Sequence, residues 1–193
     1  WKRGSDVYRS VVFTRADSGV ESVDDLVGRI IAFGEPFSTS GYLMPKAALA
    51  SAGLRLVNYE DPAASIPDDR VGYFFSNDAE NTMFWVLKEK VVAGAVNADY
   101  FEALAGARIG ELRILLTTEA VPRNVVCARR SLQPKVLQAI EDLLLEMHLN
   151  QEGRRSLERF EETARFDRFR GGPESDLALI LDLLPHVQED LGQ

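Results

Sequence analysis

Hydrophobic and polar positions follow two different periods along the chain, and together they predict strands that alternate with helices. The short apolar runs typical of strands lie at 8–15, 29–35, 54–60, 71–76, 91–97, 111–119 and 124–130. The segments with apolar residues three or four positions apart, typical of helices, lie at 18–29, 41–53, 77–90, 98–106, 131–150, 152–161 and 173–191. This order indicates an α/β fold with a mostly parallel sheet.

Pro45 restricts where the helix predicted at 41–53 can begin. A helix accepts proline only in or near its first turn, because proline has no N–H and its ring crowds the preceding turn. We therefore expect this helix to start near Ser40.

Three hydroxyl side chains stand in a row just before that helix start. Ser38, Thr39 and Ser40 follow the strand predicted at 29–35 and precede Gly41. The first N–H groups of a helix have no partner inside the helix and carry partial positive charge, so they can hold an anion. The hydroxyls would add O–H donors, and glycine would let the backbone approach closely. Serine and threonine are also ordinary helix caps, so the local pattern leaves both interpretations open.

The charge balance argues against a nucleic-acid partner. The net charge is −8, and no basic stripe is visible along the chain. The basic cluster near the end contains Arg154, Arg155, Arg159, Arg165, Arg168 and Arg170. Acidic residues are interleaved with it, which is typical of a solvated helix face.

Few residues offer chemistry of other kinds. One cysteine and two histidines supply neither a disulfide framework nor a structural zinc site, so we expect no metal and no cofactor. No nucleophile and base stand in a recognisable motif, so no enzyme is expected. Cys127 lies in a β-branched run and is predicted to be buried. No apolar run approaches the roughly 20 residues of a membrane span, and the first residues do not have the pattern of a signal peptide.

The segment 8–53 contains "DSG", "DLVGR" and "STSGYLMP" in that order. It resembles the phosphate, phosphite and phosphonate substrate-binding proteins of ABC transporters. The similarity continues through "VVAGAVNADYFEAL" at 91–104 and through residues 121–147. The resemblance implies a type II periplasmic-binding-protein fold, in which two α/β lobes joined by crossing strands close over a small oxyanion.

The resemblance also implies how the lobes divide the chain. Residues 1–20 and 121–193 would form the remainder of the first lobe with the C-terminal helices, and 21–120 the second lobe with the anion-binding helix start. The first lobe is expected to be incomplete at its N-terminal side, because the family has a further first segment. The ligand-binding residues that the resemblance implies are Ser38, Thr39, Ser40, Gly41, Asn77, Asp78, Asn97 and Asn124.

Two departures from the family pattern bear on the ligand. Asn77 and Asp78 stand where the family often has a histidine and an aspartate, and Asn97 and Asn124 stand where binders of aminoalkyl phosphonates carry acids. An amide donates to an oxyanion but does not neutralise an ammonium group. We therefore expect a plain oxyanion or an uncharged organophosphonate as the ligand.

The function implied is that of a periplasmic or extracytoplasmic solute-binding protein of an ABC uptake system, or of the equivalent sensor domain. Its partners would be a small oxyanion and a membrane permease or membrane signalling protein. One alternative is an interaction domain that has lost ligand capture and forms a homo-oligomer through its incomplete lobe. Another is the ligand-sensing domain of a signalling protein.

Overall fold

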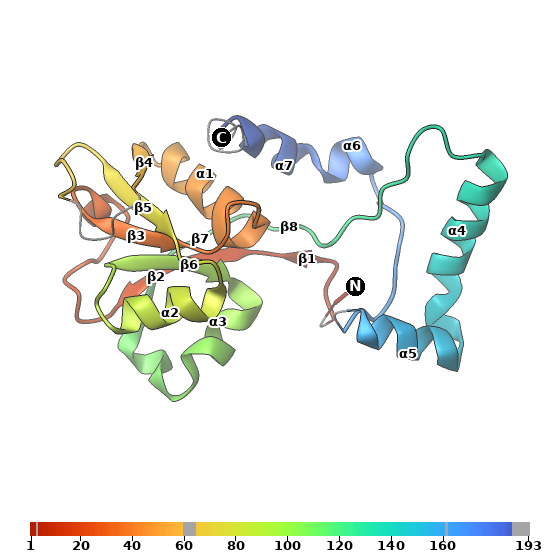
Figure 1. The fold of residues 1–193 in the computed structure, drawn as a ribbon, viewed down its shortest axis with the longest axis horizontal. Coiled ribbons are helices and arrows are strands. Elements are labelled where there is room, and N and C mark those ends of the chain that lie inside the picture. Colours follow the sequence, from red (N-terminus) through yellow and green to blue (C-terminus); the bar gives the residue numbers. More distant parts are fainter. Residues whose placement is uncertain (3, 60–64, 161, 187–193) are drawn as a thin grey trace. The chain divides into compact units, whose positions relative to one another are not determined.

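The computed structural model describes residues 1–2, 4–59, 65–160 and 162–186, and these form two compact units (Figure 1). Unit 1 contains residues 1–8 and 120–178. Unit 2 contains residues 9–119 and the described residues from Leu179 onward. We expected 9–20 and 173–191 in the first lobe; 9–20 and the described residues from Leu179 onward lie in unit 2 instead, and 173–178 lie in unit 1. The first of these differences arises because the strand that starts at Ser10 pairs on both sides with strands of unit 2.

Unit 2 is built on a six-stranded sheet with the order β4-β5-β3-β6-β2-β7. The strands are β2 (Ser10–Arg15), β3 (Ile30–Phe33), β4 (Leu56–Asn58), β5 (Val71–Phe75), β6 (Ala93–Asn97) and β7 (Leu112–Thr117). β4, β5, β3 and β6 run parallel, whereas β2 is antiparallel to both of its neighbours, β6 and β7. The sheet is therefore mixed, with its parallel part where strands and helices alternate.

Helices cover both faces of this sheet (Figure 1). They are α1 (Met44–Ser51), preceded by a π-helical turn (Thr39–Leu43), with α2 (Ala79–Leu87) and α3 (Ala98–Ala105). Side chains alternate along each strand, so Ile31 and Phe33 pack in one core with α1 while Ala32 packs in the other with α2 and α3. Short helices at Gly106–Glu111, Ala178–Leu183 (α7) and Leu184–His186 complete unit 2, and 187–191 of the predicted last helix lie outside the described residues.

The two ends of the continuous part of unit 2 are held together by hydrogen bonds. The Ser10 N–H donates to the Thr118 hydroxyl at 3.0 Å, and the Thr118 N–H donates to the Ser10 carbonyl at 3.0 Å. Both residues are buried. The first and last residues of the segment 9–119 therefore lie close together.

Two predicted elements are wrong. The helix predicted at 18–29 is only a 3₁₀ turn at Asp24–Leu26, because the Asp25 carboxylate accepts from the N–H groups of Glu21 and Ser22 and makes a local turn there. The strand predicted at 124–130 has no regular structure, and Cys127 is exposed rather than buried.

Unit 1 contains a short antiparallel pair and several helices. β1 (Val7–Tyr8) pairs with β8 (Val121–Pro122), and the helices are α4 (Pro134–Glu146), a 3₁₀ turn (Met147–Leu149), α5 (Gln151–Arg159) and α6 (Pro173–Asp176). No residue of α4 is buried, and its apolar side chains are partly exposed, with 64% exposure at Leu143. Neither unit has, in its described residues, a helix long and apolar enough to span a bilayer.

Candidate functional site

Three helix starts lie along one edge of the unit 2 sheet. β5, β3 and β6 are adjacent and parallel, and the chain leaves the carboxyl end of each strand through a polar turn into a helix. Carboxyl ends of parallel strands meet at the same edge, which is where open α/β sheets bind ligands. Gly34, at the end of β3, connects two of the turns. Its N–H donates to the Gly41 carbonyl at 3.0 Å, and its carbonyl accepts from the Asn77 N–H at 3.1 Å.

Ser38 is the cap of the central helix start. Its backbone is extended, and its Oγ accepts from the Gly41 N–H at 2.9 Å. A Cβ on Gly41 would lie 2.8 Å from that Oγ, so the side chain of Ser38 has room only because residue 41 is glycine. The Ser38 hydroxyl proton is not used in this bond and can still be donated to a ligand.

The helix begins with a wide π turn, and Pro45 prevents an ordinary α turn there. In an α-helix the ring of Pro45 would crowd the Gly41 carbonyl, and Pro45 has no N–H to give it. The Gly41 carbonyl accepts from the Gly34 N–H instead. The turn widens accordingly, because the Leu43 N–H donates to the Ser38 carbonyl at 3.0 Å and the Met44 N–H to the Thr39 carbonyl.

Thr39 and Ser40 carry hydrogen-bond donors at this helix start that no group of the described chain accepts from. Among the described residues, neither their N–H groups nor their hydroxyls have a hydrogen-bond partner, and both residues are half-buried. Two N–H groups, two hydroxyls and the Ser38 hydroxyl therefore stand together at the positive end of a helix. Such a set can surround oxyanion oxygens without a lysine or arginine.

The second helix start, after β5, has a different local role. Asn77 is exposed and has a left-handed backbone with φ of 73°, and its side chain is available to donate. The Asp78 carboxylate caps α2, where it accepts from the N–H and the side-chain amide of Asn81. A carboxylate offers only acceptors, so Asp78 does not donate to an oxyanion, and its place in a ligand site stays a prediction.

Asn97 and Asn124 lie in different units. Asn97 ends β6, and its Oδ1 caps α3 by accepting from the Asp99 N–H at 2.9 Å. β6 contacts the π turn, and the side-chain amide N–H groups of Asn97 remain as donors. Asn124 belongs to unit 1. Seven of the eight predicted residues thus follow neighbouring strands of unit 2, and Asn124 does not.

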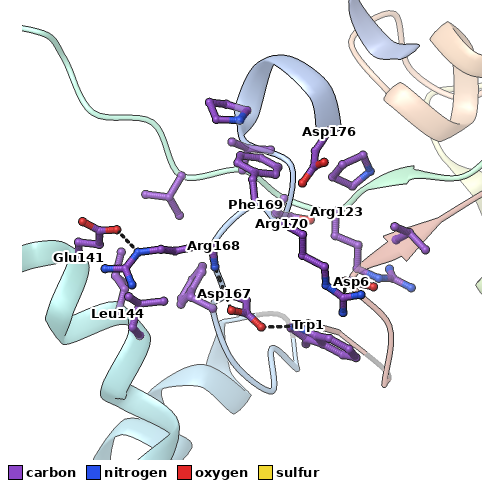
Figure 2. Close-up of a pocket in the computed structure, with 18 of the residues that line it drawn as sticks. Trp1, Asp6, Arg123, Glu141, Leu144, Asp167, Arg168, Phe169, Arg170 and Asp176 are labelled. Carbon is purple, nitrogen blue, oxygen red and sulfur yellow. Dashed lines mark hydrogen bonds and ion pairs between the residues drawn. The ribbon is translucent and has the colours of Figure 1, made fainter. Parts of the chain in front are cut away.

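Asn124 lines a cavity of about 800 Å³ within unit 1 (Figure 2). Its walls are largely apolar and include Val126, Ile140 and Leu144. Ion pairs lie around it, between Arg168 and Glu141 at 2.7 Å, between Arg170 and Asp6 at 3.4 Å, and between Arg165 and Asp167 at 3.3 Å. No local motif predicts this cavity, although the strong apolar periodicity of 131–150 indicates the helix that forms part of its wall.

A protein family matches most of the chain. It is described as "ABC transporter, phosphonate, periplasmic substrate-binding protein", and the match covers residues 1–173.

Solved structures of two bacterial proteins are similar over nearly the whole chain. XAC2383 from Xanthomonas citri, bound to ATP, is 25% identical with a TM-score of 0.88, and the match covers 98% of this chain and 69% of that one. PhnD1 from Prochlorococcus marinus (MIT 9301), in complex with methylphosphonate, is 18% identical with a TM-score of 0.68, and the match covers 97% of this chain and 70% of that one. The second likeness concerns the fold alone.

One curated relative is a membrane signalling protein. The tetrathionate sensor histidine kinase TtrS of Salmonella typhimurium is 30% identical over 95 residues. These residues are 49% of this chain and 14% of the kinase, so the chain spans only a small part of that relative's length.

Proposed function

Because the chain belongs to the family of phosphonate periplasmic substrate-binding proteins of ABC transporters, we propose that it binds a phosphate-like oxyanion at the helix start of Ser38, Thr39 and Ser40. The family and the type II periplasmic-binding-protein fold, both predicted from the sequence, are confirmed. The family is one of solute-binding proteins of the periplasm. The particular ligand and its site are our proposal.

One observation carries the proposal. Thr39 and Ser40 are half-buried residues at the start of a helix, and their N–H groups and hydroxyls have no partner among the described residues. The first donors of a helix are satisfied by caps, water or ligands, so a group of them without a partner in the described chain favours a ligand that accepts from all of them. A tetrahedral oxyanion does so, because each of its oxygens accepts more than one hydrogen bond.

The proposed ligand class follows from the donors at the helix start and from the lack of negative charge on Asn77 and Asn97. Phosphate, phosphite and small phosphonates share the oxyanion that the helix start would hold. Asn77 and Asn97 add amide donors but no negative charge, so neither would neutralise an ammonium group on the ligand. PhnD1, a relative in fold, is bound to methylphosphonate, which is a ligand of this class.

Binding would proceed without covalent chemistry. We propose that the anion binds at the helix start of unit 2, whereas a role for Asn124 of unit 1 stays a prediction. Ligand binding would then shift an open and closed equilibrium that a membrane permease reads. This would make the protein an extracytoplasmic component of an ABC uptake system.

Calorimetric titration tests the proposal. Phosphate, phosphite and methylphosphonate are titrated into the purified chain and into a Ser38→Ala, Ser40→Ala double variant. Ser22→Ala is the matched control, because Ser22 is an exposed serine of unit 2 away from this edge of the sheet. We expect binding by the parent chain and by the control, and loss of binding in the double variant with little change in melting temperature. Unchanged affinity in a folded double variant would remove these serines from the site.

The similarity to the sensor kinase favours a second candidate function, that of a ligand-sensing domain of a signalling protein. The two candidates share the site and differ in ligand and partner. Tetrathionate is therefore added to the titration as a further anion. A response to tetrathionate but not to phosphonates would favour the sensor, and the reverse would favour uptake.

A further inference from the structure

Resting on the proposed function, we propose that Lys46, with Tyr42 and Tyr73, is a positioning residue that holds the oxyanion-binding turn in its wide π form. None of these three residues touches the proposed ligand. They act on it through the turn that carries Thr39 and Ser40.

The three side chains hydrogen-bond to one another and form a polar triangle inside the core of unit 2. The Lys46 Nζ donates to the Tyr42 hydroxyl at 2.9 Å and to the Tyr73 hydroxyl at 3.2 Å, and the two hydroxyls lie 3.1 Å apart. Exposure is 7% for Lys46, 0% for Tyr42 and 1% for Tyr73. The rings of both tyrosines also contact Phe33, with centroids 5.3 and 5.2 Å away.

This triangle joins the helix start to a neighbouring strand. Tyr42 follows Gly41 directly and lies inside the π turn, Lys46 is four residues further along α1, and Tyr73 is on β5. The bond from Lys46 to Tyr42 therefore spans the junction between π turn and α-helix. The bond from Lys46 to Tyr73 fixes that junction against the sheet.

A π turn needs such support, since it is less favourable than an α turn and persists mainly at functional sites. Pro45 prevents an ordinary α turn, but it does not determine which wider geometry the chain adopts. A lysine is also a costly residue for a core, and apolar residues of similar volume are often neutral or stabilising there. The bonds of Lys46 to Tyr42 and Tyr73 lie at the junction of the π turn, where they can fix the geometry of the turn.

The test replaces the triangle by apolar residues of matched shape. The triple variant Lys46→Met, Tyr42→Phe, Tyr73→Phe removes the three mutual hydrogen bonds of the triangle together. Lys88→Met is the control, because it removes an exposed charge from the same unit. Methylphosphonate affinity, melting temperature and the ¹H–¹⁵N shifts of the Thr39 and Ser40 amides without ligand are measured for each protein.

We expect the triple variant to stay folded, to bind methylphosphonate at least about tenfold more weakly, as when a hydrogen bond to an anion is misplaced, and to shift the Thr39 and Ser40 amide signals. The control should match the parent chain in all three measurements. A folded triple variant with parental affinity and parental amide shifts overturns the proposal. If the triple variant does not fold, Tyr73→Phe alone is measured, and parental values for it overturn the proposal likewise.

The two proposals fail in different ways. If the parent chain binds no oxyanion, the proposed function fails, while the amide shifts of the ligand-free proteins still report whether the triangle holds the turn. If the parent chain binds and the folded triple variant binds equally well with parental amide shifts, the positioning role fails and the proposed function stands.

Discussion

Replacing Gly41 by alanine should separate ligand binding from stability. The new Cβ would lie 2.8 Å from the Ser38 Oγ, 3.3 Å from the Ser38 Cβ and 3.5 Å from the Gly34 Cα. The first distance is too short, and the Ser38 hydroxyl can relieve it by rotating away. That rotation breaks the cap bond between the Ser38 Oγ and the Gly41 N–H, which is 2.9 Å long.

The two effects of Gly41→Ala on the free energy of unfolding have opposite signs. Loss of the cap destabilises by about 1 kcal/mol. Alanine in place of glycine within a helix stabilises by up to about 1 kcal/mol. The melting temperature should therefore change by less than about 4 °C, given the roughly 2–4 °C per kcal/mol of a protein this long.

The expected effect on binding is larger. A hydrogen bond to a charged group contributes about 1.5–3 kcal/mol, so displacement of the Ser38 hydroxyl should weaken oxyanion binding roughly ten- to hundredfold. Calorimetry with methylphosphonate and a thermal melt measure the two quantities. Gly110→Ala is the control, because nothing lies within 4 Å of a Cβ there. Parental affinity in Gly41→Ala, or a fall in melting temperature beyond about 10 °C, would refute the reasoning.

Phe37 directly precedes Ser38 and is 86% exposed. In calorimetry, Phe37→Ser should weaken the binding of phenylphosphonate and leave the binding of inorganic phosphate unchanged. Equal losses of affinity for both ligands would exclude a contact between Phe37 and the organic group. Asp78→Ala removes the cap of α2 and should lower the free energy of unfolding in urea by about 1 kcal/mol. Its anion affinity should hold or rise, and a large loss would place the carboxylate in the site. Backbone N–H groups of Glu21 and Ser22 lower the pKa of Asp25, so this carboxylate stabilises the fold above the usual aspartate pKa of about 4 and stops doing so as the pH falls through its lowered pKa. The free energy of unfolding, measured in urea, should therefore fall less on acidification in Asp25→Asn than in the parent chain. Equal falls in the two proteins would contradict this.

Local patterns were sufficient for the elements that carry the proposed site. The strands at 29–35, 71–76 and 91–97 were predicted because continuous apolar runs are ended by glycine, proline or a polar turn, and β3, β5 and β6 lie within them. The helix start near Ser40 was predicted from Pro45, and the helix begins at Thr39.

What depends on distant residues was not predictable from local patterns. Val125 and Val126 have a strong preference for strands, but a strand also needs a hydrogen-bonding neighbour, and this segment has none among the described residues. The π turn was missed because it depends on the bond between Gly41 and Gly34, across the turn. The triangle of Lys46 was missed because its third member, Tyr73, is on another strand.

The way unit 2 closes on itself has a consequence for the order of folding. β1 and β8 belong to unit 1 and flank the segment 9–119 of unit 2. In an unfolded chain their pairing would require closure of a loop of about 110 residues, at an entropic cost of about 4 kcal/mol. The mutual bonds of Ser10 and Thr118 bring the ends of that segment together once unit 2 has formed. Unit 1 should therefore gain its strand pair late, and a change at Thr118 that leaves the unit 2 core intact should slow the assembly of unit 1 more than that of unit 2.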